Sequence, residues 1–398
     1  MNLASLLICL GVLTGAAYAD EAPGTPSSLP PGFKVIVYGN HAFDDQAIIR
    51  MSGIDQDPDL SADQVKRRLE TTSVFSNVQV KREEHSITII LEEKLTWFAL
   101  PYFSSDEYSQ IYGAAAGKAG LFGQDANFLG RYQYGKDDRE GSVLIRDEFF
   151  MHSLWILGGS FDYEDSRHKF FHDRTVTQRL RNRYYGGSFQ TGYHLKQNVI
   201  IGFNTYMETH RYQRPGGGES VGGQLSHRIN LEIGTLNVNE GLTQGAKIRP
   251  YFETTSPPSG FQFRKYGVYA QAGVFLIGNF NWIMTPKFEA GAALPQYQQF
   301  EIGGAGSLRS FPNQEFRDTK YFSVSNDFLL TTIDIWKLKL RPLIYGDWAF
   351  VQNSGRTGVG SGFNVYFREV AVPALQFFAG WGFNPYGFTV AGSIGPRF

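Results

Sequence analysis

Short segments of alternating polarity recur from Trp97 to Phe398, and this repetition limits the fold more than any other feature of the chain. In the last segment Phe388, Val390, Ile394 and Phe398 share one parity, and mostly small or polar residues stand between them. Alternation with a period of two indicates β-strands, and no long helical periodicity interrupts it. About 16 such segments follow one another, an even number as single-chain antiparallel barrels require. The pattern predicts an all-β region of about 16 antiparallel strands.

Two architectures fit this alternation, a membrane barrel and a soluble β-sandwich. Arg228 and Glu232 lie at the opposite parity from Ile229 and Ile233. Charged residues on one face are costly in lipid but tolerated in a wet lumen. The 33 Phe, 21 Tyr and 45 Gly suit many short strands with aromatic girdles. Alternation alone does not separate the two architectures, but the number of segments and the N-terminal leader favour a transmembrane β-barrel.

The first 19 residues have the pattern of a secretory signal peptide. Residues 6–16 form a short apolar core, and residues 17–19 (Ala-Tyr-Ala) fit a cleavage site. Residues 20–32 are rich in Pro, Ser and Gly and are predicted to be a flexible linker. The single cysteine, Cys9, lies in the signal segment, so we expect no disulfide and no cysteine chemistry in the mature chain. The net charge of -1 gives no indication of nucleic-acid binding.

Residues 33–95 have a different pattern, that of a small α+β domain. A capping box at Ser61–Gln64 opens one of two predicted helices. Gly39 and Asn40 form a turn pair after the first strand. The elements are expected in the order β-α-α-β-β, with strands at 33–38, 74–80 and 86–91 and helices at 44–51 and about 61–70.

Three sequence features of this domain resemble those of a POTRA domain. They are the V-x-G-N strand end at residues 37–40, the F-x-x-V strand at residues 75–78 and a last strand that runs into Glu92 and Glu93. Such domains lie in the periplasm, ahead of the barrels of the BamA/TamA superfamily of outer-membrane insertases and translocases. A generic α+β module is the alternative. The resemblance implies one POTRA domain at 33–95 and an outer-membrane barrel at 96–398 in a Gram-negative bacterium.

A glycine-rich loop at residues 294–318 carries a second resemblance to this superfamily. Residues 308–311 (Leu-Arg-Ser-Phe) resemble its V/I-R-G-F/Y loop motif, and Gly303 and Gly304 match its glycine pair. Ser310 stands where the family has glycine. By strand count the loop joins strands eleven and twelve, where the family folds its sixth loop into the barrel.

The loop motif centres on Arg309, and its expected partners are acidic residues on the barrel wall. Asp347 lies in a segment that resembles the family's F-x-D-x-G strand motif, and Asp327 sits where the family usually carries Glu. An arginine inside a barrel needs acceptors, and its planar fork suits one or two carboxylates. Arg309 is therefore expected to hold the loop to the wall, with Phe311 beside it, in an architectural role. The alternative is a solvated arginine in an ordinary outer loop.

Other chemistry finds less support in the sequence. His168, His172 and Asp173 have a spacing compatible with a metal site, but residues 165–183 are rich in Lys and Arg, so a solvated outer loop is the better interpretation. There is no G-x-S-x-G motif, although a distant Ser–His pair is not excluded. We expect a non-enzymatic protein that uses no cofactor and no metal.

The resemblance implies insertion or translocation of polypeptides at a seam between the first and last strands, without nucleotide. Pro101 and Pro396 each remove a ladder donor there, which weakens the pairing. The C-terminal Phe398, at the lipid-facing parity with Phe388, Val390 and Ile394, resembles the C-terminal signal of bacterial outer-membrane proteins.

An open seam exposes strand edges onto which a client strand can add. The POTRA edge strand at Val78 and Val80 offers a similar surface. The expected partners are unfolded outer-membrane or secreted polypeptides, the lipid bilayer and periplasmic accessory proteins, but not nucleic acid. A passive outer-membrane pore, a secretion channel dedicated to one partner and lipid handling remain open as alternatives.

Overall fold

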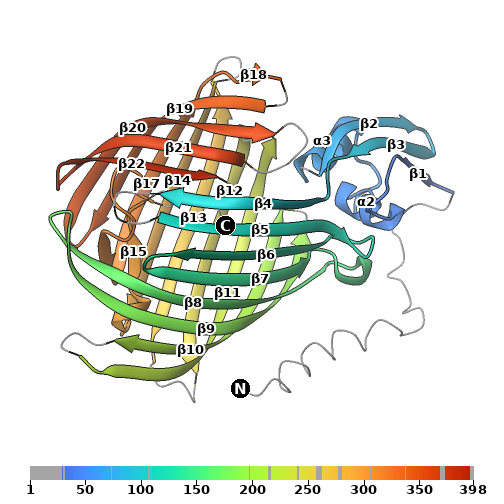
Figure 1. Cartoon of the computed structure of the whole chain (residues 1–398). Coiled ribbons are helices and arrows are strands. Elements are labelled where there is room, and N and C mark those ends of the chain that lie inside the picture. The colour runs from blue at the N-terminus through green and yellow to red at the C-terminus, as the bar shows by residue number, and fades with distance from the viewer. Residues whose placement is uncertain are drawn as a thin grey trace.

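The chain folds into a small N-terminal α+β domain followed by a closed β-barrel (Figure 1). The computed structural model describes residues 29, 32–72, 74–105, 108, 110–196, 198–213, 217–239, 242–256, 262–276, 280–304, 307–336, 338–367 and 373–394. The predicted signal segment and most of the predicted linker lie outside these residues.

The N-terminal domain has a three-stranded sheet covered by two helices. Strands β1 (Lys34–Tyr38), β2 (Phe75–Glu83) and β3 (Ser86–Glu93) lie in the order β1-β3-β2, with β1 parallel and β2 antiparallel to β3. The predicted capping box opens α3 (Ala62–Thr71), and the side chain of Asp44 caps α2 (Asp45–Ser52). The core between helices and sheet consists of fully buried aliphatic side chains, among them Ile48, Val65, Leu69, Ile87 and Ile89.

The described residues of the barrel form 16 antiparallel strands, as the alternation predicts. The short strand β18 (Ile333–Ile335) adds to the edge of β19. The strands of the wall are β4 (Trp97–Ser105), β5 (Gln110–Leu121), β6 (Ala126–Gly135), β7 (Asp138–Asp147), β8 (Trp155–His172), β9 (Thr175–Lys196), β10 (Val199–Gln213), β11 (Glu219–Asn239), β12 (Leu242–Ser256), β13 (Arg264–Phe275), β14 (Asn281–Ala292), β17 (Lys320–Leu329), β19 (Leu338–Val351), β20 (Ser354–Phe367), β21 (Pro373–Phe383) and β22 (Gly387–Ile394).

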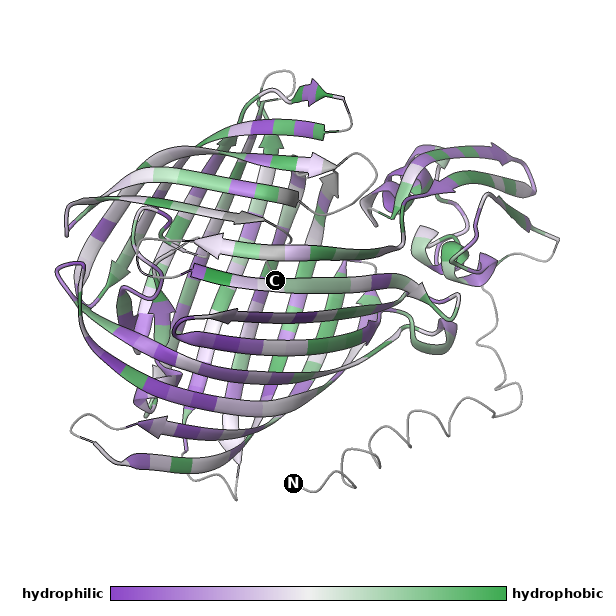
Figure 2. Ribbon diagram, in the orientation of Figure 1, coloured by the Kyte–Doolittle hydropathy of each residue, from purple (hydrophilic) through white to green (hydrophobic). Residues whose placement is uncertain are grey.

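The barrel is apolar outside and polar inside. On β19, Ile344 and Trp348 point outward and are 53% and 40% exposed, whereas Tyr345 and Asp347 point inward and are 1% exposed. The same alternation gives the banded colouring of the strands in Figure 2. An apolar outer surface that runs around the whole barrel suits contact with lipid. The closed wall thus excludes the soluble sandwich, which would bury this face between two sheets.

No helix among the described residues is both long and apolar enough to cross a bilayer.

One prediction about the outer loops is wrong. Residues 165–183 were expected to form a solvated loop, but β8 and β9 continue through them as paired strands. Only Asp173 and Arg174, with φ of 46° and 65°, form the turn between these strands. The reason is that the ladder hydrogen bonds form with any side chains, and polar residues on both faces are tolerated where a hairpin projects beyond the apolar belt.

The described pairing between the first and last strands is short. Within the described residues, β22 pairs with β4 over residues 392–394 and 103–105, whereas β4 pairs with β5 along its whole length. Residues 387–391 of β22 therefore extend past the end of β4. The remainder of the seam, with residues 395–398, lies outside the described part of the chain.

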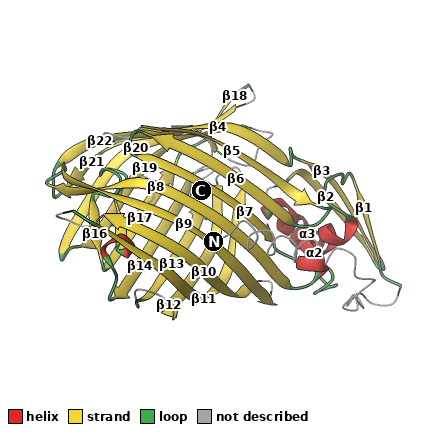
Figure 3. Ribbon diagram, turned by 60° about the horizontal axis from the view of Figure 1, so that its bottom comes forward, coloured by secondary structure: helices red, strands yellow, loops and turns green. Residues whose placement is uncertain are grey.

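The N-terminal domain sits against one end of the barrel, called here the near end (Figure 3). The main-chain N–H of Asp44, at the start of α2, donates to the carbonyl oxygen of Gly123 in the β5–β6 turn at 2.8 Å. On the other side of the domain, Thr71 Oγ1 at the end of α3 lies 3.0 Å from Asn237 Oδ1 of β11. The far end of the barrel carries the long β8–β9 hairpin.

Candidate functional site

The loop between β14 and β17 folds into the barrel, and these are its eleventh and twelfth strands, as predicted. The loop contains a turn of 3₁₀ helix (Gln296–Gln298) and a small hairpin of β15 (Phe300–Ile302) and β16 (Phe316–Asp318). Its glycine pair bends the chain after β15: Gly303 and Gly304 have φ of 123° and 73°. A Cβ at position 303 would lie 2.3 Å from the carbonyl oxygen of Pro312, so only glycine fits there.

Arg309 meets both expected carboxylates on the barrel wall. Its main-chain N–H and its Nε donate to Asp347 Oδ2 at 2.9 Å and 3.0 Å, and its Nη2 donates to Oδ1 at 2.6 Å. Its Nη1 forms an ion pair with Asp327 on β17. The guanidinium also stacks on Tyr345, with Cζ 4.1 Å from the ring centroid. Because Arg309 is 7% and Asp347 1% exposed, this is a buried, two-carboxylate clamp rather than a surface pair.

Ser310 fits where the family motif has glycine because the wall opposite lacks side chains. Ser310 is not among the residues with positive φ, so its backbone conformation does not require glycine. Its hydroxyl lies 3.2 Å from Tyr345 Oη. A Cβ on Gly358 of β20 would lie 2.7 Å from Ser310 Cβ, and one on Gly380 of β21 would lie 2.6 Å from its Oγ. The loop tip and these wall glycines are therefore complementary in shape.

An apolar cluster surrounds the clamp. Phe311 is fully buried and packs edge-to-face on Phe316, with ring centroids 5.3 Å apart. Ala349, at the last position of the F-x-D-x-G-like segment, is also fully buried in this cluster. The cluster holds the two arms of the loop together against β17 and β19, so the loop is a packed part of the barrel interior.

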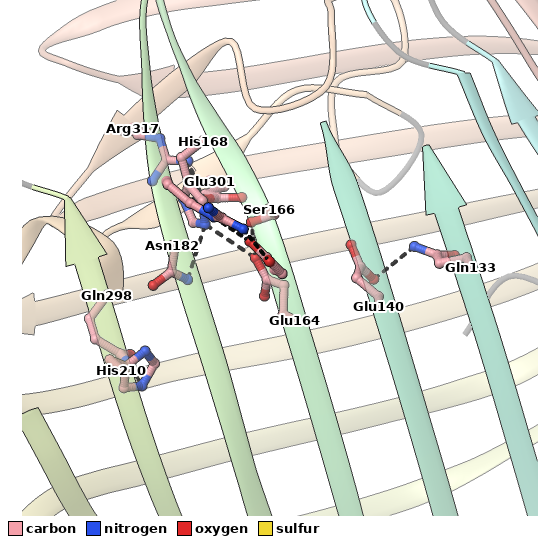
Figure 4. A network of polar contacts seen from close by, with 12 residues as sticks. Gln133, Glu140, Glu164, Ser166, His168, Asn182, His210, Gln298, Glu301 and Arg317 are labelled. Atoms are coloured by element: carbon pink, nitrogen blue, oxygen red, sulfur yellow. Dashed lines mark hydrogen bonds and ion pairs between the residues drawn. The ribbon is translucent and has the colours of Figure 1, made fainter. Parts of the chain in front are cut away.

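The small hairpin of the loop has a second polar anchor, which the sequence did not suggest (Figure 4). Glu301 and Arg317 are ion-paired across β15 and β16 and both reach His168 of β8. His168 Nδ1 lies 2.9 Å from Glu301 Oε1, and its Nε2 lies 3.3 Å from both Glu164 Oε1 and Asn182 Nδ2. The prediction that residue 168 is solvated is wrong, because it is 5% exposed.

A polar cavity of about 450 Å³ lies between this anchor and the barrel wall. Its charged lining is mostly acidic, including Glu140, Glu164 and Glu208, and also contains Lys265 and Lys287. No group of three or more His, Cys, Asp or Glu with the geometry of a metal site occurs among the described residues. The side chains of His172 and Asp173 are 83% exposed at the β8–β9 turn and do not line this cavity.

In the N-terminal domain, Gly39 and Asn40 serve a turn that the last strand stabilises. Gly39 has a φ of 89°, and a Cβ there would lie 2.0 Å from the carbonyl oxygen of Leu91. Asn40 Nδ2 donates to Phe43 O at 2.9 Å. The carboxylate of Glu93 accepts main-chain N–H groups of residues 41–43 at 2.8–3.2 Å. The V-x-G-N and Glu-Glu motifs thus meet in space and shape one turn.

The residues assigned to strand edges are placed as follows. Val78 and Val80 lie on β2, which is an edge strand of its sheet, although Val78 itself is buried. Pro101 lies in β4 and pairs with β5. Phe388 and Val390 point outward from β22 and are 47% and 42% exposed. Ile394 pairs with β4 at the seam, and Pro396 and Phe398 lie outside the described residues.

The closed barrel with its preceding α+β domain has the fold of BamA and CdiB, as comparison with solved structures shows. BamA from Haemophilus ducreyi lacking POTRA domains 1-3 has a TM-score of 0.59 and 13% identity, over 92% of this chain and 84% of that chain. CdiB from Escherichia coli has a TM-score of 0.63 and 11% identity, over 91% and 76% of the two chains. CdiB from Acinetobacter baumannii has a TM-score of 0.61 and 12% identity, over 91% and 73%. No family model and no curated protein matches the sequence.

Proposed function

We propose that this chain is an outer-membrane insertase or translocase that handles polypeptide clients without nucleotide. The likeness to BamA and CdiB supports the fold on which this proposal rests. The observation that carries it is the seam, where the described residues of β22 and β4 pair over 392–394 and 103–105 and β22 then continues past this pairing. A wall with a weak joint can open there, whereas a passive pore gains nothing from such a joint.

The proposed mechanism uses two strand edges. The N-terminal domain lies in the periplasm and presents β2, whose free edge can bind an extended client segment by strand addition. At the seam, the edge of β22 templates a client strand in the same way once it has separated from β4. The loop held by Arg309 occupies the interior next to β22 and keeps the wall in shape while the seam opens.

Photo-crosslinking in intact cells tests this proposal. A photoreactive residue is placed in turn at Pro101, Phe398 and Val80, with Ile229 as the control, an outward position on β11 that is 53% exposed to lipid. Nascent outer-membrane proteins captured at the first three positions but not at Ile229 support an insertase. A single exported protein captured at both seam and domain means a dedicated secretion channel. Capture of lipid and neighbouring barrel residues alone refutes the client mechanism.

A disulfide across the seam gives an independent test. Ser105 and Gly392 are Cα partners there, so S105C with G392C closes the joint covalently. We expect oxidation to stop client handling and reduction to restore it. The control pair A99C and A116C joins β4 to β5, which have no reason to separate, and should have no effect. No loss in the seam pair, or equal loss in both pairs, would contradict an opening seam.

The passive-pore alternative makes a different prediction. A pore requires an open path, but the loop with its apolar cluster is packed in the interior against β17 and β19. Single-channel recording in planar bilayers decides between the two. Steady conductance in the parent protein without any client supports the pore, whereas conductance that appears only after deletion of residues 294–318 supports the insertase.

A further inference from the structure

The tip of the β8–β9 hairpin contacts the last strand of the barrel across its far mouth. Strands β8 and β9 are 18 and 22 residues long, whereas β4 and β22 have 9 and 8 described residues. In barrel order β8 and β9 are the fifth and sixth strands and β22 is the sixteenth. The hairpin therefore leans over the mouth to reach the end of β22, on the left of Figure 1.

The contact is made by Arg174 in the hairpin turn. Its Nη2 donates to Thr389 Oγ1 at 2.5 Å and to the carbonyl oxygen of Phe388 at 3.4 Å. Its Nη1 donates to the carbonyl oxygen of Ser310 at 3.4 Å. The guanidinium also faces the ring of Phe311, with Cζ 5.7 Å from the centroid. A single side chain thus joins the hairpin, the last strand and the tip of the inward loop.

These contacts fall beyond the described pairing of β22 with β4. Among the described residues this pairing ends at Gly392 and Ser105, and residues 387–391 continue past it. Arg174 donates to a main-chain carbonyl oxygen in this part of β22. Tyr108, between β4 and β5, donates its hydroxyl to the carbonyl oxygen of Arg174 at 2.5 Å. The turn therefore contacts both the start of β22 and the connection between β4 and β5.

Two further features show that Arg174 is fitted to this place. Gly387 leaves room for it, because a Cβ there would lie 2.4 Å from Arg174 Nε. Asp173 and Arg174 have φ of 46° and 65°, as a two-residue turn between antiparallel strands requires, so the turn presents the Arg174 side chain at its tip.

We propose that the hairpin tip, Asp173 and Arg174, is a latch that closes the far half of the seam and ties it to the inward loop. With the latch engaged, Arg174 covers the edge of β22, so that an added strand must displace it. That Arg174 is displaced during transport rests on the proposed function. The latch itself is a property of the closed barrel and is measurable without a client.

Dipolar electron paramagnetic resonance measures the latch directly. Spin labels are attached at H172C, next to the turn, and Y386C, in the β21–β22 turn; both native side chains are exposed. A Cys9→Ser background removes the single cysteine of the sequence. In lipid vesicles the parent protein should give one narrow distance distribution. R174Q should raise the population of a second, broad range of distances about tenfold above its level in the parent. The reason is that hydrogen bonds from a charged donor are among the stronger ones.

A second variant and a control make the test specific. G387A perturbs the same contact from the strand side and should broaden the distribution as R174Q does. R167Q removes a charge from the same hairpin, where Arg167 is 55% exposed and pairs with Asp137, and should leave the distribution unchanged. Heat-modified gel mobility confirms that each variant is folded. An unchanged distribution in folded R174Q, or equal broadening in R167Q, overturns the latch, whatever the client experiments show.

Discussion

The Arg309 clamp gives the prediction that the structure defines most sharply. Arg309→Met keeps the length and apolar volume of the side chain but removes its charge. Asp347 then loses two of its three hydrogen bonds and remains 1% exposed, with the Asp327 carboxylate facing the same site. Removal of one partner of a buried ion pair costs about 3–5 kcal/mol, because the remaining charge stays buried without compensation. We expect a loss of this size in the free energy of unfolding.

Urea unfolding in lipid vesicles, followed by the fluorescence of the six tryptophans, measures this loss. A double-mutant cycle with Asp347→Asn separates the pair from its surroundings, and we expect the double variant to cost about 2–3 kcal/mol less than the sum of the single ones. The control is Arg249→Met: Arg249 is 48% exposed in its pair with Glu232, so it should cost less than about 1 kcal/mol. The clamp is refuted if Arg309→Met lowers the free energy of unfolding no more than Arg249→Met does. It is also refuted if the effects of Arg309→Met and Asp347→Asn are strictly additive.

Three further predictions follow from single contacts. Gly358→Ala should cost about 1–3 kcal/mol by overpacking against the loop tip, and Ser310→Gly should restore most of it, as measured by the same unfolding assay. Gly39→Ala should cost about 2 kcal/mol or more, because the new methyl group meets the carbonyl of Leu91 at a backbone with positive φ; faster hydrogen exchange in residues 34–52 would report it, and unchanged exchange would contradict it. Burial raises the pKa of the Asp55 carboxyl, so its favourable contribution to folding is complete below the unfolded pKa and is lost as the pH rises through the folded pKa. Asp55→Asn also loses the ion pair with Arg50, but its effect on protection from exchange in the N-terminal domain should be more favourable at pH 7 than at pH 3.5, and an equal effect at both values would contradict the assignment.

The sequence predicts this fold well because strand alternation is a local property. The polarity of each strand residue indicates the face on which it lies. The number of strands and the inward position of Asp347 can therefore be predicted from neighbouring residues in the chain. The position of the inward loop follows from counting those strands. The helices were predicted within a residue or two because capping groups such as Ser61 act on N–H groups only three residues away.

The parts that could not be predicted are contacts between segments far apart in the chain. Arg174 and Thr389 are separated by 215 positions, and Arg317 and His168 by 149. Nothing in the residues near His168 indicates that a hairpin of the loop will cover it, so a polar stretch was interpreted as solvated. Ser310 is a similar case, because the space for its side chain is made by glycines on β20 and β21.

Main-chain hydrogen bonds between strands and side-chain contacts both hold the barrel wall, but they break in different ways. A ladder between strands loses its hydrogen bonds together, whereas side-chain contacts can be released one at a time. At the far end of the seam the described ladder stops at Gly392 and Ser105, and β22 beyond it is held by contacts with the loop tip and Arg174. Since Ser310 follows Arg309 directly, a loop freed from its clamp should also withdraw the carbonyl that Arg174 binds. We therefore expect Arg309→Met to broaden the distance distribution between hairpin and last strand, although Arg309 touches neither. An unchanged distribution in that variant would mean that clamp and latch act independently.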